Sequence, residues 1–402
     1  MTNDRSPAGA LGIGMVGHAF MGRTHSQAWR SVSAFFAPPL TPVMAVLAGR
    51  DRARTAAAAA SLGWAAAVTD WKELLRRDDV GLVDICTPGD THAEIAVAAL
   101  EAGKHVLCEK PLANTVAEAE AMAAAARAAR GRGVRAMVGF NYRRVPALAL
   151  ARRLVAAGRI GTVRHVRAQY LQDWLVDPEF PLVWRLDAER AGSGALGDIG
   201  AHIVDAAQYV TGDRLAGVTA LTETFVRERP LATAAAGLAA TGDGGGARGP
   251  VTVDDAALFI GRTEGGALAS FEATRFATGR KNALRLEVNG SAGSLAFDFE
   301  AMNELWFHDG AEDADTAGFR RVLVTEPGHP YAGAWWPPGH LLGYEHTFTH
   351  QAADLLAAVA AGTDPAPSFD DGLQVQRVLA AVAGSAAAGG GWTPVDPPAA
   401  AP

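Results

Sequence analysis

The first third of the chain alternates apolar runs with segments of helical composition, and this alternation constrains the fold more than any other feature. The apolar runs have the length and composition of buried strands, and they lie at residues 11–16, 42–48, 80–86, 105–108 and 136–140. Strands that alternate with helices of roughly 10–15 residues form parallel sheets covered by helices on both faces. We therefore predict a Rossmann-type, doubly wound α/β domain over residues 1–139.

The pattern changes after about residue 140, where apolar and polar residues alternate in most of the remaining runs. These runs lie at 163–174, 218–226, 256–261, 267–274, 284–288, 294–299 and 321–324. Period-two runs joined by glycine-bearing turns are typical of an antiparallel sheet with one covered face. Helical patterns occur at 146–157, 194–209, 347–361 and 372–388. We expect residues 140–402 to form an α+β domain with a large, mostly antiparallel open sheet that binds substrate and mediates oligomerisation.

A glycine-rich loop follows the first predicted strand and indicates a dinucleotide site. The literal G-x-G-x-x-G match begins at Gly12, but its first residues fall inside the strand, where they cannot face a pyrophosphate. The frame that follows the strand and opens the next helix fits the expected phosphate loop. That frame is Gly17-His18-Ala19-Phe20-Met21-Gly22. Ala19 replaces the usual second glycine, so we expect its methyl group to displace the pyrophosphate modestly.

The end of the second predicted strand bears on the choice between NAD and NADP. An acidic residue commonly binds the adenosine ribose there, but Gly49 occupies that position and Arg50 follows it. A guanidinium suits a 2′-phosphate, so these residues give a slight preference for NADP. Arg50 as a solvated surface residue is an equal alternative, and Asp51 can still reach a ribose, so NAD stays open.

Two short motifs carry candidate catalytic groups. Glu109-Lys110-Pro111 directly follows a central strand, at the sheet edge where open α/β sheets bind ligands. Asp198 and His202 are four residues apart, so a helix places them on one face, and a histidine with a carboxylate neighbour suits acid–base chemistry between alcohol and ketone. Taken singly, a surface turn explains the first motif, and a helix-capping aspartate beside an incidental histidine explains the second.

Together these motifs resemble the glucose–fructose oxidoreductase, inositol dehydrogenase and MocA (Gfo/Idh/MocA) family over essentially the whole chain. The chain is most similar to the levoglucosan dehydrogenase-like sugar dehydrogenases of that family, through the stretches at 140–144, 170–174, 184–185, 194–198 and 329–331. The resemblance implies a catalytic set of Lys110, Asp198 and His202. His202 would be the general base, Lys110 would stabilise the reacting oxygen, and Asp198 would hold the polyol or orient His202. Whether His202 or Lys110 moves the proton stays open.

Further residues are candidates for the two binding sites. For the cofactor they are the phosphate-loop residues, Gly49 and Arg50, together with Thr87, Pro88, His92, Glu109 and Lys110. Polyol recognition needs planar hydrogen-bonding groups and aromatic faces, with core packing as the alternative for each aromatic ring. The substrate candidates are Lys110, Tyr142, Arg143, Gln172, Trp174, Arg185, Asp198, His202 and Trp335.

Composition excludes several other classes of protein. A net charge of −7 argues against nucleic acid or an anionic membrane as the main partner. Cys86 and Cys108, both in buried runs, fit a reducing compartment, and no run reaches the ~18 apolar residues of a membrane span. His346 and His350 have metal-pair spacing without a third ligand, so we expect no metal site. We expect a cytoplasmic homo-oligomer, a dimer or tetramer.

The function predicted from these features is an NAD(P)-dependent oxidoreductase. It would transfer a hydride between the nicotinamide and a secondary hydroxyl carbon of a sugar, anhydrosugar or cyclitol. One alternative uses the same cofactor transiently, so that a keto-sugar intermediate allows glycoside cleavage and the cofactor is regenerated. Another alternative is an inactive nucleotide-binding sensor, against which the intact Lys110, Asp198 and His202 set argues.

Overall fold

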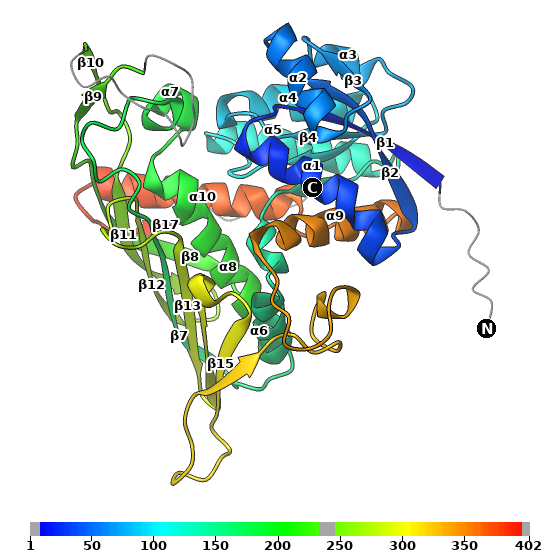
Figure 1. The fold of residues 1–402 in the computed structure, drawn as a ribbon. Coiled ribbons are helices and arrows are strands. Elements are labelled where there is room, and N and C mark those ends of the chain that lie inside the picture. The colour runs from blue at the N-terminus through cyan, green and yellow to red at the C-terminus, as the bar shows by residue number, and fades with distance from the viewer. Residues whose placement is uncertain (1–8, 233–245, 396–402) are drawn as a thin grey trace, which may run out of the picture. The chain divides into compact units, whose positions relative to one another are not determined.

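The computed structural model describes residues 9–232 and 246–395, which form two compact units (Figure 1). The first unit contains residues 9–113, 117–141 and 343–373. The second contains residues 114–116, the described part of 142–342, and 374–395. Among the described residues, no helix is both long enough and apolar enough to cross a membrane.

A six-stranded parallel sheet forms the centre of the first unit. Its strands are, in spatial order, β3 (Ala66–Val68), β2 (Leu40–Ala48), β1 (Gly9–Val16), β4 (Leu82–Ile85), β5 (His105–Cys108) and β6 (Ala136–Val138). Its helices are α1 (Phe20–Phe36), α2 (Arg52–Leu62), α3 (Lys72–Leu75), α4 (His92–Glu101) and α5 (Val116–Arg130). Every residue of β4 and β6 is buried, as expected for strands covered on both faces. The predicted Rossmann-type fold is confirmed, and β3 is an additional edge strand.

A helix from late in the sequence also belongs to the first unit. Helix α9 (Tyr344–Ala361) packs against α1, and Phe348 and Leu355 share a core cluster with Trp29 and Val32. Helix α10 (Phe369–Ala387) begins in the first unit and continues into the second. Sequence patterns indicate that these segments are helices but carry no signal of which sheet they join.

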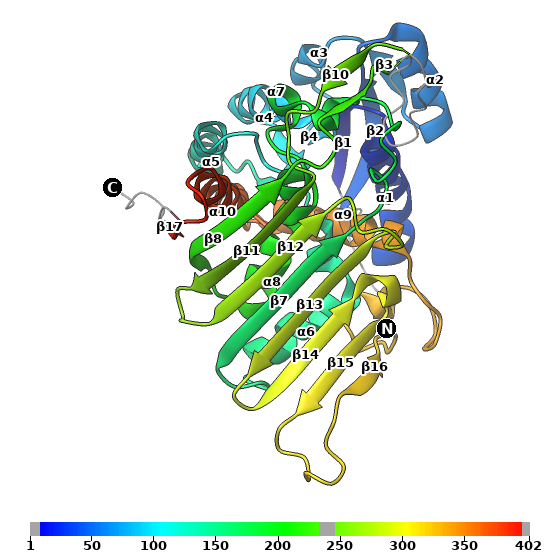
Figure 2. The same ribbon diagram turned by 90° about the vertical axis from the view of Figure 1, so that its left-hand side faces the viewer.

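The second unit is built on a nine-stranded open sheet (Figure 2). Its strands are, in spatial order, β16 (Arg320–Leu323), β15 (Glu304–Asp309), β14 (Gly293–Asp298), β13 (Ala283–Gly290), β7 (Val163–Leu171), β12 (Leu268–Thr274), β11 (Ala256–Thr263), β8 (Leu215–Glu223) and β17 (Thr393–Pro394). Neighbouring strands are antiparallel except β7 and β12, which pair in parallel. The predicted mostly antiparallel sheet is confirmed. The sequence patterns missed β15, β17 and a separate hairpin of β9 (Glu228–Pro230) and β10 (Arg248–Pro250).

Helices cover one face of this sheet. Helix α6 (Pro146–Ala156) packs on β14 and β15, and α8 (Ala201–Thr211) packs on β7 and β13. Figure 2 looks onto the opposite face, which the described helices leave open and which exposes Leu258 and Ile260 of β11. The alternating burial of β11 therefore separates a covered core face from an uncovered apolar face.

The helix predicted over 194–209 departs from a regular α-helix. Its first part, Leu196–Gly200, is a π-helix, which runs directly into α8. Asp198 therefore lies within the π-helix and His202 at the beginning of α8, so the two predicted residues share one continuous helical segment. Wide turns of this kind occur frequently at functional sites.

Candidate active site

The phosphate loop lies at the carboxyl end of β1 in the predicted frame. Gly12 and the second glycine of the literal match are inside β1, and a Cβ on Gly12 would lie 1.6 Å from the carbonyl oxygen of Asp79. Gly17 follows the strand with a φ of +98°, and a Cβ on Gly22 would lie 2.3 Å from the Gly17 carbonyl oxygen. These two glycines allow the strand to turn sharply into α1 and the helix to pack closely on the turn.

The beginning of α1 suits an anion such as a pyrophosphate. Ala19 is the N-cap and provides no side-chain acceptor, and the first turn carries no acidic residue. The N–H groups of the first turn therefore stay available to a ligand, and the helix dipole favours a negative charge there. Phe20 is half exposed and stacks on Tyr344, with ring centroids 6.2 Å apart. The loop and helix of this unit fit the pyrophosphate of a dinucleotide.

The end of β2 has no space for the usual acidic residue. A Cβ on Gly49 would lie 2.5 Å from Oγ1 of Thr55 and 2.8 Å from the ring of His18. Burial lowers the pKa of His18 below 6.5, and Arg54 adds to this effect. Arg50 is exposed, so the structure places a neutral imidazole at the position where an acidic side chain commonly binds the ribose.

The loops after β4 and β5 are held together by a buried histidine. The ring nitrogens of His92 lie 2.9 Å from the Thr87 carbonyl oxygen and 3.0 Å from the Pro111 carbonyl oxygen. Pro88 and Lys110 belong to the same two loops and are partly exposed. His92, predicted as a cofactor contact, therefore connects the two loops that carry the other candidates.

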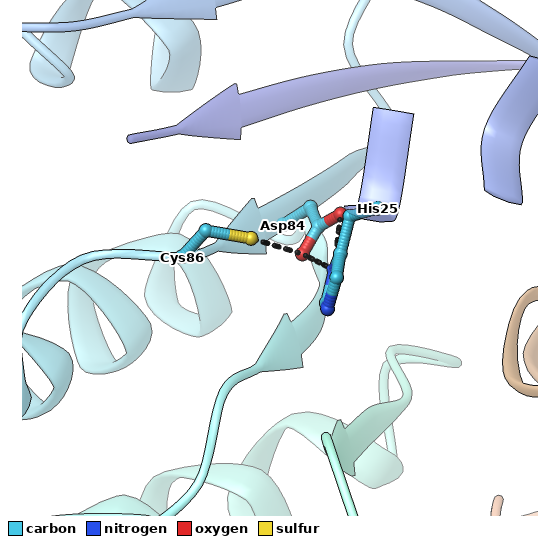
Figure 3. Close-up of side chains that lie close together, drawn as sticks. All are labelled: His25, Asp84 and Cys86. Atoms are coloured by element: carbon cyan, nitrogen blue, oxygen red, sulfur yellow. Dashed lines mark hydrogen bonds and ion pairs between the residues drawn. The ribbon is translucent and has the colours of Figure 1, made fainter. Parts of the chain in front are cut away.

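The sequence patterns do not indicate a buried cluster that contains His25, Asp84 and Cys86 (Figure 3). The imidazole of His25, on α1, lies between the carboxylates of Asp84, on β4, and Glu109, which follows β5. Asp84 also accepts hydrogen bonds from Trp29 Nε1 at 2.7 Å and from the Cys86 thiol at 3.6 Å. We call these five residues the histidine cluster. Glu109, predicted to contact the cofactor, is buried and turns its carboxylate toward His25 instead.

In the second unit, two arginines flank Asp198. Arg275 Nη1 lies 3.7 Å and Arg185 Nε 4.0 Å from the same carboxylate oxygen. Arg275 is fully buried and lies over the ring of Trp174. Asp198 keeps 24 % of its side chain exposed, so its carboxylate is accessible to a ligand while the arginines orient it. Arg275 was not predicted, because it directly follows β12, far from Asp198 in sequence.

The π-helix that carries Asp198 is anchored by another carboxylate. Asp254 accepts hydrogen bonds from the N–H groups of Gly194 at 2.7 Å and Leu196 at 2.8 Å. A Cβ on Gly194 would lie 1.7 Å from the Asp254 carbonyl oxygen, so this close approach requires glycine. Arg275 donates to the same carbonyl oxygen at 3.0 Å. Asp254 thus fixes the entry to the segment that carries the candidate catalytic residues.

His202 lies against tyrosine rings within the second unit. It is buried, and its ring is 4.5 Å from that of Tyr142 and 5.9 Å from that of Tyr170. The two tyrosine hydroxyls hydrogen-bond to each other at 2.6 Å, and the Tyr170 hydroxyl donates to Asn282 at 2.7 Å. The imidazole of His202 therefore packs against two tyrosine rings that are joined by a hydrogen bond.

The hydrogen-bonded chain continues to two predicted substrate residues. Gln172 donates to the same Asn282 oxygen at 2.8 Å, and Trp174 Nε1 donates to Gln172 at 3.0 Å. The structure therefore connects the predicted residues Tyr142, Gln172 and Trp174, and it adds Asn282 and Tyr170 to the network. A lone asparagine between strands carries no sequence signal of such a role.

Two other predicted substrate residues have different surroundings. The Arg143 guanidinium forms a bidentate pair with Asp205 of α8, with distances of 2.6–3.0 Å, and stacks on Tyr209. This pairing gives Arg143 a role in packing, and we leave it out of the substrate set proposed below. Trp335 is partly exposed beside Trp336, with ring centroids 6.1 Å apart.

Comparisons with known proteins agree with this architecture. Residues 11–140 match the family described as "Oxidoreductase family, NAD-binding Rossmann fold", and residues 148–296 match the "GFO/IDH/MocA C-terminal domain". Levoglucosan dehydrogenase of Pseudarthrobacter phenanthrenivorans is 43% identical over 380 residues, which cover 94% of this chain and 96% of that protein. Inositol 2-dehydrogenase of Rhizobium meliloti is 28% identical over 73% of this chain and 75% of its own length.

Solved structures show the same similarity. An oxidoreductase domain protein from Kribbella flavida superposes with a TM-score of 0.92 and 66% identity, covering 97% of this chain and all of that one. A levoglucosan dehydrogenase in complex with NADH and levoglucosan has a TM-score of 0.90 and 41% identity, with coverage of 96% and 100%. The similarity therefore includes both units.

Proposed function

Because the chain belongs to the GFO/IDH/MocA family of oxidoreductases, we propose that it is an NAD-dependent dehydrogenase of a sugar, anhydrosugar or cyclitol. The observation that carries this proposal is the setting of His202, an imidazole held by tyrosines beside a chain of hydroxyl and amide groups. This set of side chains offers both a proton acceptor and the hydrogen-bonding groups that a polyol needs.

Each candidate residue has a distinct task in this proposal. His202 accepts the proton of the reacting hydroxyl during oxidation, and Lys110 donates a hydrogen bond to the oxygen as negative charge develops on it. Asp198, oriented by Arg185 and Arg275, accepts hydrogen bonds from a neighbouring hydroxyl. The nicotinamide, when bound, supplies the hydride acceptor.

An anhydrosugar is the substrate class we place first. Support comes from the levoglucosan dehydrogenase relative, which is similar over nearly the whole chain. The side chains we assign to substrate recognition are Arg185, Gln172, Trp174 and Asp198, all partly exposed, with Trp335 as a further aromatic contact.

We propose NAD as the working cofactor. The preference for NADP rests on Arg50, whereas the solved levoglucosan dehydrogenase complexes contain NADH. His18 and Thr55 fill the space beside Gly49, so we assign ribose recognition to the His18 ring and Asp51 in place of an acidic residue 49. Fluorescence titration with NADH and NADPH tests this assignment. NADPH binding more tightly than NADH, with the difference removed in Arg50→Ala, would restore the NADP assignment.

The experiment for the activity follows reduced-cofactor formation at ~pH 8–9, where an ordinary histidine base is neutral. NAD and NADP are each offered with levoglucosan, free sugars, inositols and aryl glycosides, and His202→Asn serves as the inactive control. Reduced cofactor accumulating with one polyol class supports the proposal. Products released from glycosides without net cofactor reduction would instead support redox-assisted cleavage. Tight NADH binding without any turnover would favour the sensor alternative.

We also propose that the open face of the nine-stranded sheet joins two copies of the chain. This face exposes Leu221, Leu258 and Ile260, and it contains a shallow hollow of about 650 Å³. Arg167 and Glu287 line the same hollow and already pair with each other at 3.0 Å within the chain, so the face presents few uncompensated charges to a second copy related by a twofold axis. A contiguous exposed apolar surface of this kind is typical of an interface.

Sedimentation velocity tests the interface directly. Ile260→Lys should convert the oligomer to a smaller species, whereas Leu341→Lys, at a similarly exposed leucine outside the hollow, should leave the assembly unchanged. An assembly that survives Ile260→Lys would exclude this face. For the location of the enzyme we propose the cytoplasm, since Cys86 and Cys108 are both free thiols, and cell fractionation tests that assignment.

A further inference from the structure

We propose that His25 is a buried imidazolium that positions Glu109 and, through it, the backbone of Lys110. His25 is a positioning residue in this proposal, because it is buried and acts on the Lys110 turn only through its contact with Glu109. The proposal rests on the function assigned to Lys110 above, but its central observables can be measured without substrate.

Both nitrogens of the His25 ring lie within hydrogen-bond distance of a carboxylate. Nδ1 lies 2.9 Å and 3.0 Å from the two carboxylate oxygens of Asp84, and Nε2 lies 3.0 Å from Oε1 of Glu109. A neutral imidazole carries one N–H, so it can donate to one carboxylate and would present a lone pair to the other. Donation to both carboxylates needs the doubly protonated ring.

The electrostatic surroundings of His25 favour its charged form. Burial acts to lower the pKa of His25, but the charge and hydrogen bond of Asp84, with a contribution from Cys86, raise it well above 6.5. The titratable groups facing the ring are Asp84 from β4, Cys86 directly after β4, and Glu109 after β5. Helix α9 contributes the apolar ring of Phe348, 5.3 Å from that of His25.

Glu109 connects the charged ring to the catalytic turn. Its Oε2 accepts the N–H of Lys110 at 3.2 Å, while its Oε1 accepts from His25. Glycine at position 139 leaves room for this carboxylate, because a Cβ there would lie 2.7 Å from Oε1. The carboxylate is therefore confined on three sides, by His25, by Gly139 and by the Lys110 backbone.

Asp84 anchors the other end of the cluster. Trp29 donates to it from α1 and Cys86 donates to it from the position directly after β4, so the location of Asp84 does not depend on His25 alone. With two carboxylates and one imidazolium, the cluster has a net charge of −1. Removing the charge of His25 would leave two carboxylates facing each other across a buried space, and Glu109 would be the less restrained of the two.

The same geometry resembles a metal site, and protonation explains it without a metal. Ligand atoms of His25, Asp84 and Cys86 lie within 4.8 Å of one another. An imidazolium has no lone pair on either nitrogen and cannot coordinate a metal, so the proton occupies the position that a cation would take.

The experiment reads the protonation of His25 and the environment of Lys110 separately. The chain has four lysines, Lys72, Lys104, Lys110 and Lys281, so reductive ¹³C-methylation yields a small set of NMR signals that single Lys→Arg variants assign. Selective ¹⁵N-histidine labelling reports both ring nitrogens of His25. Neither NMR measurement requires turnover, so both remain valid tests even if the proposed function is wrong.

The main variants are Glu109→Gln and His25→Gln, with His105→Gln as the matched control. His105 begins β5, the strand that ends directly before Glu109. In the native protein both nitrogens of His25 should remain protonated above pH 6.5. Glu109→Gln should lower the pKa of His25 relative to the native protein, because the glutamine amide can donate to a neutral Nε2 and preserve packing. Asp84 still acts to raise that pKa in the variant. Both main variants should shift the Lys110 signal and leave the exposed Lys72 and Lys281 unchanged.

Activity provides the third measurement. Glu109→Gln should lower kcat by roughly 10- to 100-fold through displacement of Lys110, while the Kd of NADH changes by less than about twofold. His105→Gln should alter neither. If His25→Gln fails to fold, the measurements on Glu109→Gln still test the proposal. The proposal is overturned if His25 titrates with an ordinary pKa, if added Zn²⁺ binds stoichiometrically and shifts the His25 signals, or if the Lys110 signal is unmoved in Glu109→Gln.

Discussion

Asp254→Asn tests whether the segment carrying Asp198 is held from outside its own helix. The native carboxylate accepts two backbone hydrogen bonds, from Gly194 at 2.7 Å and Leu196 at 2.8 Å. Asparagine has the same shape but one acceptor oxygen, so its amide group must face one of the two N–H groups. The variant loses one charge-assisted bond, and the other becomes a weaker, neutral bond.

The expected cost follows from these contacts. A hydrogen bond to a charged group contributes about 1.5–3 kcal/mol, so Asp254→Asn should destabilise the second unit by about that amount. For a unit of this size each kcal/mol lowers the melting temperature by roughly 2–4 °C, which gives a decrease of roughly 3–12 °C. Because Asp198 follows the anchored turn, kcat/KM should also decrease at temperatures where the variant is fully folded.

Differential scanning calorimetry measures the decrease, and Asp187→Asn provides the matched control. Asp187 caps the short helix α7 (Ala188–Ala191) through one bond to the Glu189 N–H at 3.1 Å, in a more exposed setting. Its replacement should cost about 0.5–1 kcal/mol. If Asp254→Asn lowers the melting temperature no more than Asp187→Asn does, the anchoring role assigned to Asp254 is refuted.

Three further predictions concern other parts of the structure. His202→Asn should lower kcat by about 10²- to 10⁴-fold, the usual contribution of a general base, with NADH affinity unchanged in a fluorescence titration; a loss below tenfold would move the proton-transfer role to another group. Gly22→Ala should weaken NADH binding and lower the melting temperature, since its Cβ would lie 2.3 Å from the Gly17 carbonyl oxygen, and native-like affinity in a titration would contradict that packing. Cys86 and Cys108 should resist iodoacetamide at pH 8 in the folded protein, because burial raises the pKa of both thiols and keeps them protonated; mass spectrometry should detect alkylation after denaturation, and rapid labelling of the folded chain would show that these strands open.

Local sequence patterns predicted most of the secondary structure correctly. The helix expected at 146–157 is α6, the helix expected at 347–361 forms most of α9, and the strand expected at 105–108 is β5. These elements follow from apolar periodicity and composition, which act over a few residues. The wide turn at Leu196–Gly200 was not predicted, and the carboxylate that binds its entry, Asp254, lies 60 positions from Gly194.

For the candidate site, too, the sequence predicts some features and not others. Motif position was enough to nominate the Gly17 loop, Lys110 and the Asp198–His202 segment, because each directly follows a strand or begins a helix. The side chains that surround these residues could not be predicted from the sequence. Nothing near Asp198 in sequence indicates that Arg275 lies beside it, and nothing near Glu109 indicates that it faces His25, 84 residues earlier.

The sequence by itself therefore determined the two folding patterns, the phosphate-loop frame and the identity of the chemical groups. Each of these depends on interactions between near neighbours, whose geometry is set by strand and helix periods. The tertiary structure alone decided which charges are buried together, which helix joins which sheet and which carboxylate anchors the wide turn. Those features depend on long-range packing, because the protonation and orientation of a buried group are set by whichever distant side chains the fold brings against it.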